Sequence, residues 1–102
     1  MDQLNFGRYS DPALLILASL AGGAKHGYAM MLDIEQMTGV HLGPGTLYGA
    51  LARLQKAQLI EALSSNDRRQ PYQLTTQGSN LLRRQLTMLS NFTELVLKRL
   101  IT

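Results

Sequence analysis

The side chains of this sequence that could do chemistry are mainly cations, and they gather in the middle of the chain. Residues 41–84 hold six lysines and arginines against two acids, a net charge of +4, whereas the rest holds four against five, a net charge of −1. Basic side chains at this density neutralise phosphates, so the asymmetry indicates a nucleic-acid partner. The cations that we expect to meet phosphates are Arg53, Lys56, Arg68 and Arg69.

The sequence contains no residue pattern that supports catalysis or metal binding. The chain has no cysteine, which excludes disulfides, thiolate chemistry and cysteine zinc sites. His26 and His41 stand 15 residues apart without such partners, so we expect no metal site. No Ser/His/Asp set with motif support, Walker loop or Rossmann fingerprint occurs, and the GPG at 43–45 is a helix start rather than a phosphate cradle. We expect neither an enzyme nor a bound cofactor.

The segment GPGTLYGALARLQKAQLIEAL, residues 43–63, must position two of the four cations. Gly43 can serve as the N-cap of a helix and Pro44 as its first residue. Three leucines at helical spacing, Leu47, Leu51 and Leu54, face a core, whereas the opposite face carries only small and basic residues. Such a face is thin enough to enter a major groove about 12 Å wide, and the free amides of the first turn favour a phosphate. The residues of this helix that we expect at DNA are Pro44, Gly45, Thr46, Tyr48, Gly49, Arg53 and Lys56.

The other helices and strands are predicted from capping and turn residues. Ser10-Asp11-Pro12 starts a helix that ends at Gly22-Gly23, and a second helix runs from about Tyr28 to Thr38 with Gly39 as its stop. His26 precedes and caps this second helix, whose apolar face is read as Tyr28, Met31, Leu32 and Ile34. Residues 60–63 and 71–74 are β-compatible and flank the polar turn SSNDRRQ, which predicts a hairpin with Arg68 and Arg69 near its tip. Thr75-Thr76 then caps a last helix that reaches about Leu100.

Three short helices, a hairpin and a final helix predict a mainly α (α+β) fold, the winged helix-turn-helix, with a two-stranded wing and a long C-terminal dimerisation helix. We assign residues 1–75 to the winged domain and 76–102 to the dimerisation helix. The wing arginines then lie along the DNA backbone or in the minor groove, although they could merely solubilise a turn. The hydroxyls of Tyr28 and Tyr48 either reach a phosphate or lie half-buried at the edge of the core.

The last helix carries two adjoining apolar stripes, one from Leu82 to Leu100 and one from Leu81 to Leu95. Two stripes exceed what packing on a small domain requires, so one can cover the winged domain while the other meets a partner subunit. The alternative is a helix of the single chain buried on both sides. We expect a homodimer interface formed by Leu82, Leu86, Leu89, Phe92, Val96 and Leu100.

Three motifs resemble those of the PadR family of bacterial transcriptional regulators, over roughly residues 10–85. They are HGY at the start of the second helix, PGTLY-x-x-L-x-R-L in the third, and Y-x-LT-x-x-G at the entry to the last. The resemblance implies a dimer that binds palindromic operator DNA, usually as a repressor, with an effector acting at or near the dimer interface. Gln58 departs from the glycine that usually ends the third helix, so a non-glycine residue is expected to adopt a left-handed conformation.

An effector would then bind between the first and last helices and be largely apolar, in contact with Met88 and Phe92. The apolar run ALLILASLA at 13–21 follows Asp11-Pro12 rather than a basic region and is too short to span a bilayer, so we expect a cytoplasmic protein without a membrane partner. A rival interpretation is a winged-helix module that contacts other proteins and does not bind DNA.

Overall fold

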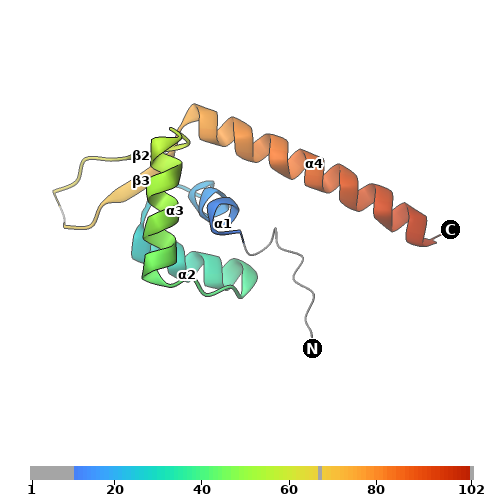
Figure 1. Ribbon diagram of the computed structural model, residues 1–102, viewed down its shortest axis with the longest axis horizontal. Coiled ribbons are helices and arrows are strands. Elements are labelled where there is room, and N and C mark those ends of the chain that lie inside the picture. Colours follow the sequence, from blue (N-terminus) through green and yellow to red (C-terminus); the bar gives the residue numbers. More distant parts are fainter. Residues whose placement is uncertain (1–10, 67, 102) are drawn as a thin grey trace.

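Four helices and three short strands make up the described residues, 11–66 and 68–101, of the computed structural model (Figure 1). In chain order they are α1 (Pro12–Leu20), β1 (Lys25–His26), α2 (Gly27–Thr38), α3 (Pro44–Lys56), β2 (Ile60–Ala62), β3 (Pro71–Leu74) and α4 (Thr76–Ile101). The predicted fold, a mainly helical winged helix-turn-helix with a long C-terminal helix, is confirmed.

The ends of the helices lie where the caps predict them. The Asp11 carboxylate accepts a hydrogen bond from the amide of Ala13, 3.0 Å away, in front of Pro12. At α2, Nδ1 of His26 lies 3.4 Å from the amide nitrogen of Ala29, and the helix ends at Gly39 with φ +79°. Local sequence therefore determined these boundaries to within a residue or two.

Gln58 does adopt the expected left-handed conformation, with φ +64°. The amide of Gln58 donates to the carbonyl of Gln55 and the amide of Leu59 donates to that of Leu54, each at 3.0 Å. This pair of bonds is the Schellman motif that closes α3. The carbonyl of Gln58 also accepts from the Thr75 hydroxyl at 2.7 Å, so the end of α3 is tied to the start of α4.

The sheet contains a strand that the sequence analysis missed. The wing hairpin, β2 and β3, is extended by β1, and the antiparallel order is β1-β3-β2, so the prediction of a two-stranded wing was incomplete. Lys25 pairs with Tyr72 and His26 with Pro71. A two-residue strand has no periodicity of its own and forms only because a distant strand presents its edge. It attaches the wing directly to the start of α2.

Helices α1, α2 and α3 enclose the core together with the inner side of the sheet. Its buried apolar residues are Leu15, Ile16, Leu17, Leu20, Met30, Ile34, Leu42, Leu47, Ala50, Leu51, Leu54, Ile60 and Leu82. The predicted apolar face of α2 was wrong in part, because Met30 and Ile34 point inward while Leu32 is exposed and Tyr28 is 60% exposed. Side chains four residues apart share one helix face, and the Met30–Ile34 pair decided which face that is.

A buried hydroxyl joins α1, α2 and β1. Ser19 donates from Oγ to the Asp33 carboxylate at 2.7 Å, and Nζ of Lys25 donates to the Ser19 carbonyl at 2.6 Å. The same ammonium group lies 3.9 Å from Oδ2 of Asp33. Lys25 thus satisfies a carbonyl at the end of α1 and fixes the orientation of α2.

Only the beginning of α4 packs on the winged domain. Within this helix the buried residues are Gly78 and Leu82, and Figure 1 shows the rest extending away from the domain. The expectation that one apolar stripe covers the domain along its length was therefore wrong. The reason is length, since α1 has 9 residues and spans about 14 Å while α4 has 26 and spans about 39 Å. Among the described helices none combines the length and apolar character that a membrane span requires.

Candidate nucleic-acid interface

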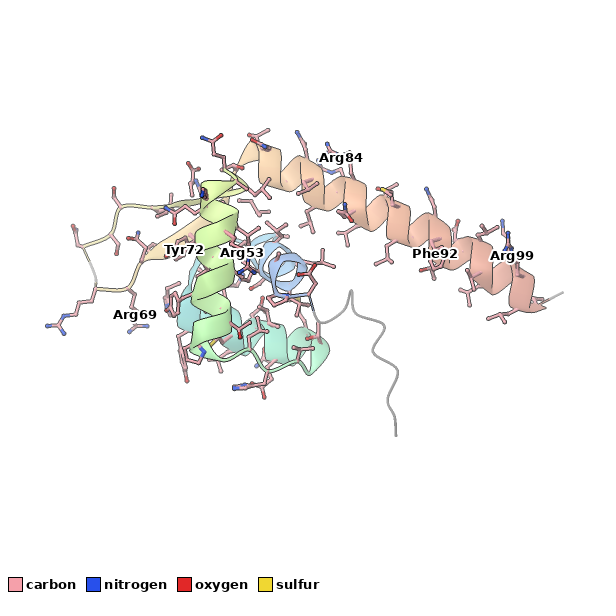
Figure 2. The ribbon with its side chains drawn as sticks, viewed as in Figure 1. Arg53, Arg69, Tyr72, Arg84, Phe92 and Arg99 are labelled. Atoms are coloured by element: carbon pink, nitrogen blue, oxygen red, sulfur yellow. The ribbon has the colours of Figure 1, made fainter. Side chains whose placement is uncertain are left out.

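The outer face of α3 is open. Gly49, Ala52, Arg53 and Lys56 are exposed, while the leucines of the opposite face are buried. A Cβ added at Gly49 would meet only Nη1 of Arg53, 3.8 Å away. Nothing in the described chain thus lies over this face, and Figure 2 shows Arg53 on it.

The first turn of α3 presents its backbone. Pro44, Gly45 and Thr46 are exposed, and the N-cap Gly43 offers no side chain to bond the amides that follow. Such amides carry the positive end of the helix dipole and can donate to an anion. The structure therefore gives this turn the geometry that the sequence analysis expected of it.

Two of the sequence motifs meet at one glycine. The Tyr48 side chain of α3 lies against Gly27 at the start of α2, where an added Cβ would be 2.5 Å from the tyrosine hydroxyl. A larger residue at this position would have to displace the Tyr48 ring. Tyr48 is 50% exposed and lies against Gly27, so it is half-buried, whereas Tyr28 is 60% exposed.

A hollow of about 340 Å³ joins α2, α3 and the wing. The structure brings four of the predicted DNA-contacting residues together in its lining, and adds three that were not predicted. The lining residues are His26, Gly27, Tyr28, Tyr48, Arg68, Arg69 and Gln70. Among the described residues of this lining none is acidic, and Nη1 of Arg69 lies 3.1 Å from Nε2 of His26. Arg53 and Lys56 are not part of the lining and lie elsewhere on α3.

The site residues that sequence reasoning missed are His26, Gly27 and Gln70. His26 was assigned only the cap of α2, but its place in β1 also carries it to the wing. Gln70 is exposed, and its side-chain amide donates to the carbonyl of Leu63 across the hairpin. Neither role has a local signal, since both depend on strand pairing. Within the described residues no group of three potential metal ligands comes together.

A second hollow, of about 500 Å³, lies between the end of α1 and α4. It is where the sequence analysis placed an effector, but its lining mixes apolar and polar side chains and does not include Met88 or Phe92. The lining residues are Ala21, Leu74, Ser79, Leu82, Arg83, Leu86, Thr87, Ser90 and Asn91.

The six residues expected at a dimer interface fall into two groups. Leu82 is 5% exposed and belongs to the core of its own chain. Leu86, Phe92 and Leu100 are exposed, Phe92 to 64%, while Leu89 and Val96 are partly covered. Figure 2 shows Phe92 on the part of α4 that extends beyond the winged domain.

Comparison with known proteins identifies the family to which this chain belongs. The model of the transcriptional regulator PadR-like family matches residues 16–84, which contain the second half of α1, all elements from β1 to β3 and the start of α4. A solved structure of a PadR family transcription regulator from hypervirulent Clostridium difficile superposes with a TM-score of 0.75 at 25% identity. The superposition covers 89% of this chain and 98% of that one.

Two curated proteins are similar over part of this chain. An "uncharacterized 37.1 kDa protein in transposon TN4556" of Streptomyces fradiae is 49% identical over 78 residues, covering 76% of this chain and 23% of that protein. The transcriptional activator GvpE2 of Halobacterium salinarum is 35% identical over 66 residues, covering 65% of this chain and 33% of that protein. The chain therefore matches about a quarter to a third of the length of these relatives.

Proposed function

Because this chain belongs to the PadR-like family of transcriptional regulators, we propose that it binds palindromic operator DNA as a homodimer and represses transcription. The observation that carries the proposal is the exposed basic surface formed by the outer face of α3 and the arginines of the wing. The family is one of regulators rather than enzymes, and the geometry supports DNA rather than a small substrate as the main partner.

DNA binding would use α3 as the recognition helix. Gly49 and Ala52 let the helix backbone approach the base edges, while Arg53 and Lys56 neutralise phosphates on either side of the groove. Arg68 and Arg69 reach the backbone or the minor groove from the wing. The first turn of α3, with Pro44, Gly45 and Thr46, and the hydroxyls of Tyr28 and Tyr48 add phosphate contacts.

Dimerisation would use the outer part of α4. Large apolar side chains of this helix are exposed to solvent in the single chain: Leu86, Met88, Phe92, Leu95, Leu97, Leu100 and Ile101. A surface of this kind on a helix that leaves its domain marks an interaction site. A second copy related by a two-fold axis would cover it with the same surface, and two-fold symmetry matches a palindromic operator. Leu82 holds α4 to its own domain, and the partner contacts fall to Leu86, Leu89, Phe92, Val96 and Leu100.

An apolar effector would release the DNA by changing how α4 sits on α1. Met88 and Phe92 project from the surface that we assign to the dimer, so we place the effector between subunits. Anilinonaphthalene sulfonate, a fluorescent probe with an apolar ring system and a charged sulfonate group, should bind the dimer, and Phe92→Ala should weaken that binding at least threefold while DNA affinity stays within about tenfold. Loss of DNA binding in this variant without any probe would assign Phe92 to the dimer alone.

The salt dependence of DNA affinity tests the central proposal. Each neutralised phosphate contributes about 0.9 to the slope of log affinity against log salt, so a dimer should show a steep slope. The double substitution Arg68→Ala, Arg69→Ala should flatten the slope by roughly two to four and weaken binding to operator and random duplex alike. Arg83→Ala, Arg84→Ala removes the same charge from α4 and serves as the matched control, with the slope unchanged.

A shallow slope in the wild type that neither pair of substitutions changes would contradict DNA binding and favour the protein-contact module. The sign of regulation is read separately, from a reporter placed behind the operator. Expression that falls when the regulator is produced supports repression, whereas expression that rises would make it an activator like the protein named GvpE2.

Sedimentation tests the dimer with two adjacent positions of α4. Phe92→Glu places a charge on the apolar surface and should give monomers at micromolar concentration. Asn91→Glu places the same charge about 100° around the helix, beside the winged domain, and should leave the dimer intact. A wild type that sediments as a monomer, or a Phe92→Glu variant that stays dimeric, would contradict this interface.

A further inference from the structure

Thr75 connects the start of α4 directly to the end of α3. Its hydroxyl donates to the carbonyl of Gln58 at 2.7 Å and accepts from the amide of Gly78 at 2.9 Å. Its amide donates to the carbonyl of Leu59 at 3.1 Å. One residue therefore caps α4 and binds two consecutive carbonyls of the turn that closes α3. Figure 1 shows these two helix ends beside each other.

Gly78 brings the backbone of α4 against the same turn. This glycine is buried, and a Cβ at its position would overlap the carbonyl of Leu59. The turn itself is held from both sides. The amides of Gln58 and Leu59 donate back into α3, while their carbonyls accept from Thr75. The four residues Gln58, Leu59, Thr75 and Gly78 thus form one hydrogen-bonded unit, which we call the α3–α4 junction.

The junction determines the direction in which α4 leaves the domain. No linker precedes the helix, since β3 ends at Leu74 and α4 begins at Thr76. Leu82, the next buried residue of α4, packs on the core by apolar contact, which holds the helix on the domain without specifying its direction. Hydrogen bonds are directional, so the contacts of Thr75 restrict the tilt of α4 against α3.

The tilt is important because α4 is long. Its 26 residues span about 39 Å. A tilt of about 5° at one end of such a helix displaces the other end by about 3.4 Å, the rise of one base pair. In the dimer proposed above, the partner holds the outer part of α4, so the same tilt moves α3 relative to α3 of the other subunit. The separation of two recognition helices sets the half-site spacing that a dimer accepts.

We propose that Thr75 is a positioning residue for DNA recognition, whose hydrogen bond to the Gln58 carbonyl makes α3 and α4 one rigid unit and thereby fixes the half-site spacing of the operator. The part that concerns spacing rests on the proposed dimer and on DNA binding. An effector that changes the direction of α4 then moves α3 with it.

Substitutions of Thr75 separate its bond to Gln58 from its role as a cap. Thr75→Ser retains both. Thr75→Asp retains a good N-cap, but an ionised carboxylate only accepts and cannot donate to the Gln58 carbonyl. Both variants should fold, with thermal midpoints within a few degrees of the wild type, because Gln58 is exposed and water can replace the lost donor. Thr75→Val, which has the shape of threonine without the hydroxyl, takes the place of Thr75→Asp if that variant unfolds.

A pair of spin labels measures the rigidity of the junction within one chain. The sequence has no cysteine, so Gln55→Cys in α3 and Glu94→Cys in α4, both at exposed positions, define one label pair. Dilution with an excess of unlabelled protein of the same variant confines the measured distance to a single chain, whatever the oligomeric state. Double electron–electron resonance should give a narrow distance distribution for the wild type and for Thr75→Ser, and a clearly broader one for Thr75→Asp. Equal widths for the serine and aspartate variants would overturn the proposal.

Half-site spacing is the readout that a merely stabilising role would not move. Selection from a pool of random duplexes by the wild type and by Thr75→Ser should enrich inverted half-sites at a single spacing. Thr75→Asp should enrich the same half-sites at two or more spacings, because the outer face of α3 is unchanged. A single spacing in the aspartate variant, equal to that of the wild type, would overturn the positioning role of Thr75.

The failures of the two proposals are distinguishable. A wild type that enriches no duplex overturns the DNA-binding function, and the label distances still decide whether Thr75 makes the junction rigid. A wild type that enriches single half-sites overturns the dimer. Equal label distributions in all variants overturn the junction, whatever the wild type binds.

Discussion

The open face of α3 makes Gly49 the most informative position to change. An added side chain there would meet only the Arg53 guanidinium of its own helix, 3.8 Å from the Cβ, so even glutamate fits without displacing the core. Gly49→Glu, its neutral counterpart Gly49→Gln and the small Gly49→Ala form a matched series. The three side chains separate the effects of helix propensity, size and charge.

Stability should rise in all three variants. Glycine inside a helix is about 0.5–1 kcal/mol less favourable than alanine, and glutamine and glutamate recover much of that difference. Glutamate at 49 stands four residues before Arg53 and can pair with it, which adds about 0.3–0.5 kcal/mol. Thermal unfolding should therefore give midpoints at or above that of the wild type, by a few degrees at most.

DNA affinity should respond to charge instead. A carboxylate about 5 Å from a phosphate costs roughly 1–3 kcal/mol for effective dielectric constants between 80 and 20. A dimer has two such positions, so Gly49→Glu should weaken operator binding by about 30-fold at least, and by up to about 20,000-fold. The pairing with Arg53 also removes one phosphate contact from each subunit, which should flatten the salt slope by about two relative to Gly49→Gln.

Fluorescence anisotropy with a labelled operator duplex measures both quantities, with thermal unfolding of each variant as the folding control. Gly49→Ala should bind nearly as the wild type does, and Gly49→Gln should show the cost of size alone. Equal affinities and equal salt slopes for the glutamate and glutamine variants would refute the placement of this helix face in the groove. An unfolded Gly49→Glu variant would refute the claim that the face is open.

Three further predictions concern contacts that hold the helices of the winged domain together. Gly78→Ala should lower the free energy of unfolding by about 3 kcal/mol or more in urea denaturation, because its Cβ would overlap the backbone carbonyl of Leu59. An unchanged urea midpoint would contradict the close contact between Gly78 and Leu59. Gln58→Gly should raise the free energy of unfolding by roughly 0.5–1 kcal/mol, because glycine avoids the left-handed penalty of about 1–2 kcal/mol but loses more entropy on folding. A lower free energy of unfolding in this variant would mean that the Gln58 side chain contributes packing. Ser19→Ala should lower the free energy of unfolding by about 1–3 kcal/mol, because the hydrogen bond to Asp33 is lost. A variant as stable as the wild type would disprove this contribution.

The sequence alone determined the elements and the cations. Helix starts at Asp11-Pro12 and Gly43-Pro44 and the stop at Gly39 are local effects of caps and backbone sterics, so they can be read from neighbouring residues. The left-handed Gln58 was expected from the resemblance to a family that usually has glycine at this position. The inward leucines of α3 and the basic tip of the wing follow from periodicity and composition. The PadR-like family was also visible in three motifs, two of whose glycines, Gly27 and Gly78, the structure explains by close approaches to Tyr48 and Leu59.

Only the tertiary structure decided which helices, strands and side chains that are distant in the sequence contact one another. The strand β1 exists because β3 offers it an edge, with paired residues 45 and 47 positions apart, and that pairing carries His26 to Arg69, a contact that no local pattern encodes. The face of α2 that turns inward and the point at which α4 leaves the domain depend on the shape of the core, since a short α1 can cover only the first turns of a long helix. Periodicity shows that a side of α4 is apolar, but coverage depends on which surfaces lie within reach, and that is a property of the folded chain.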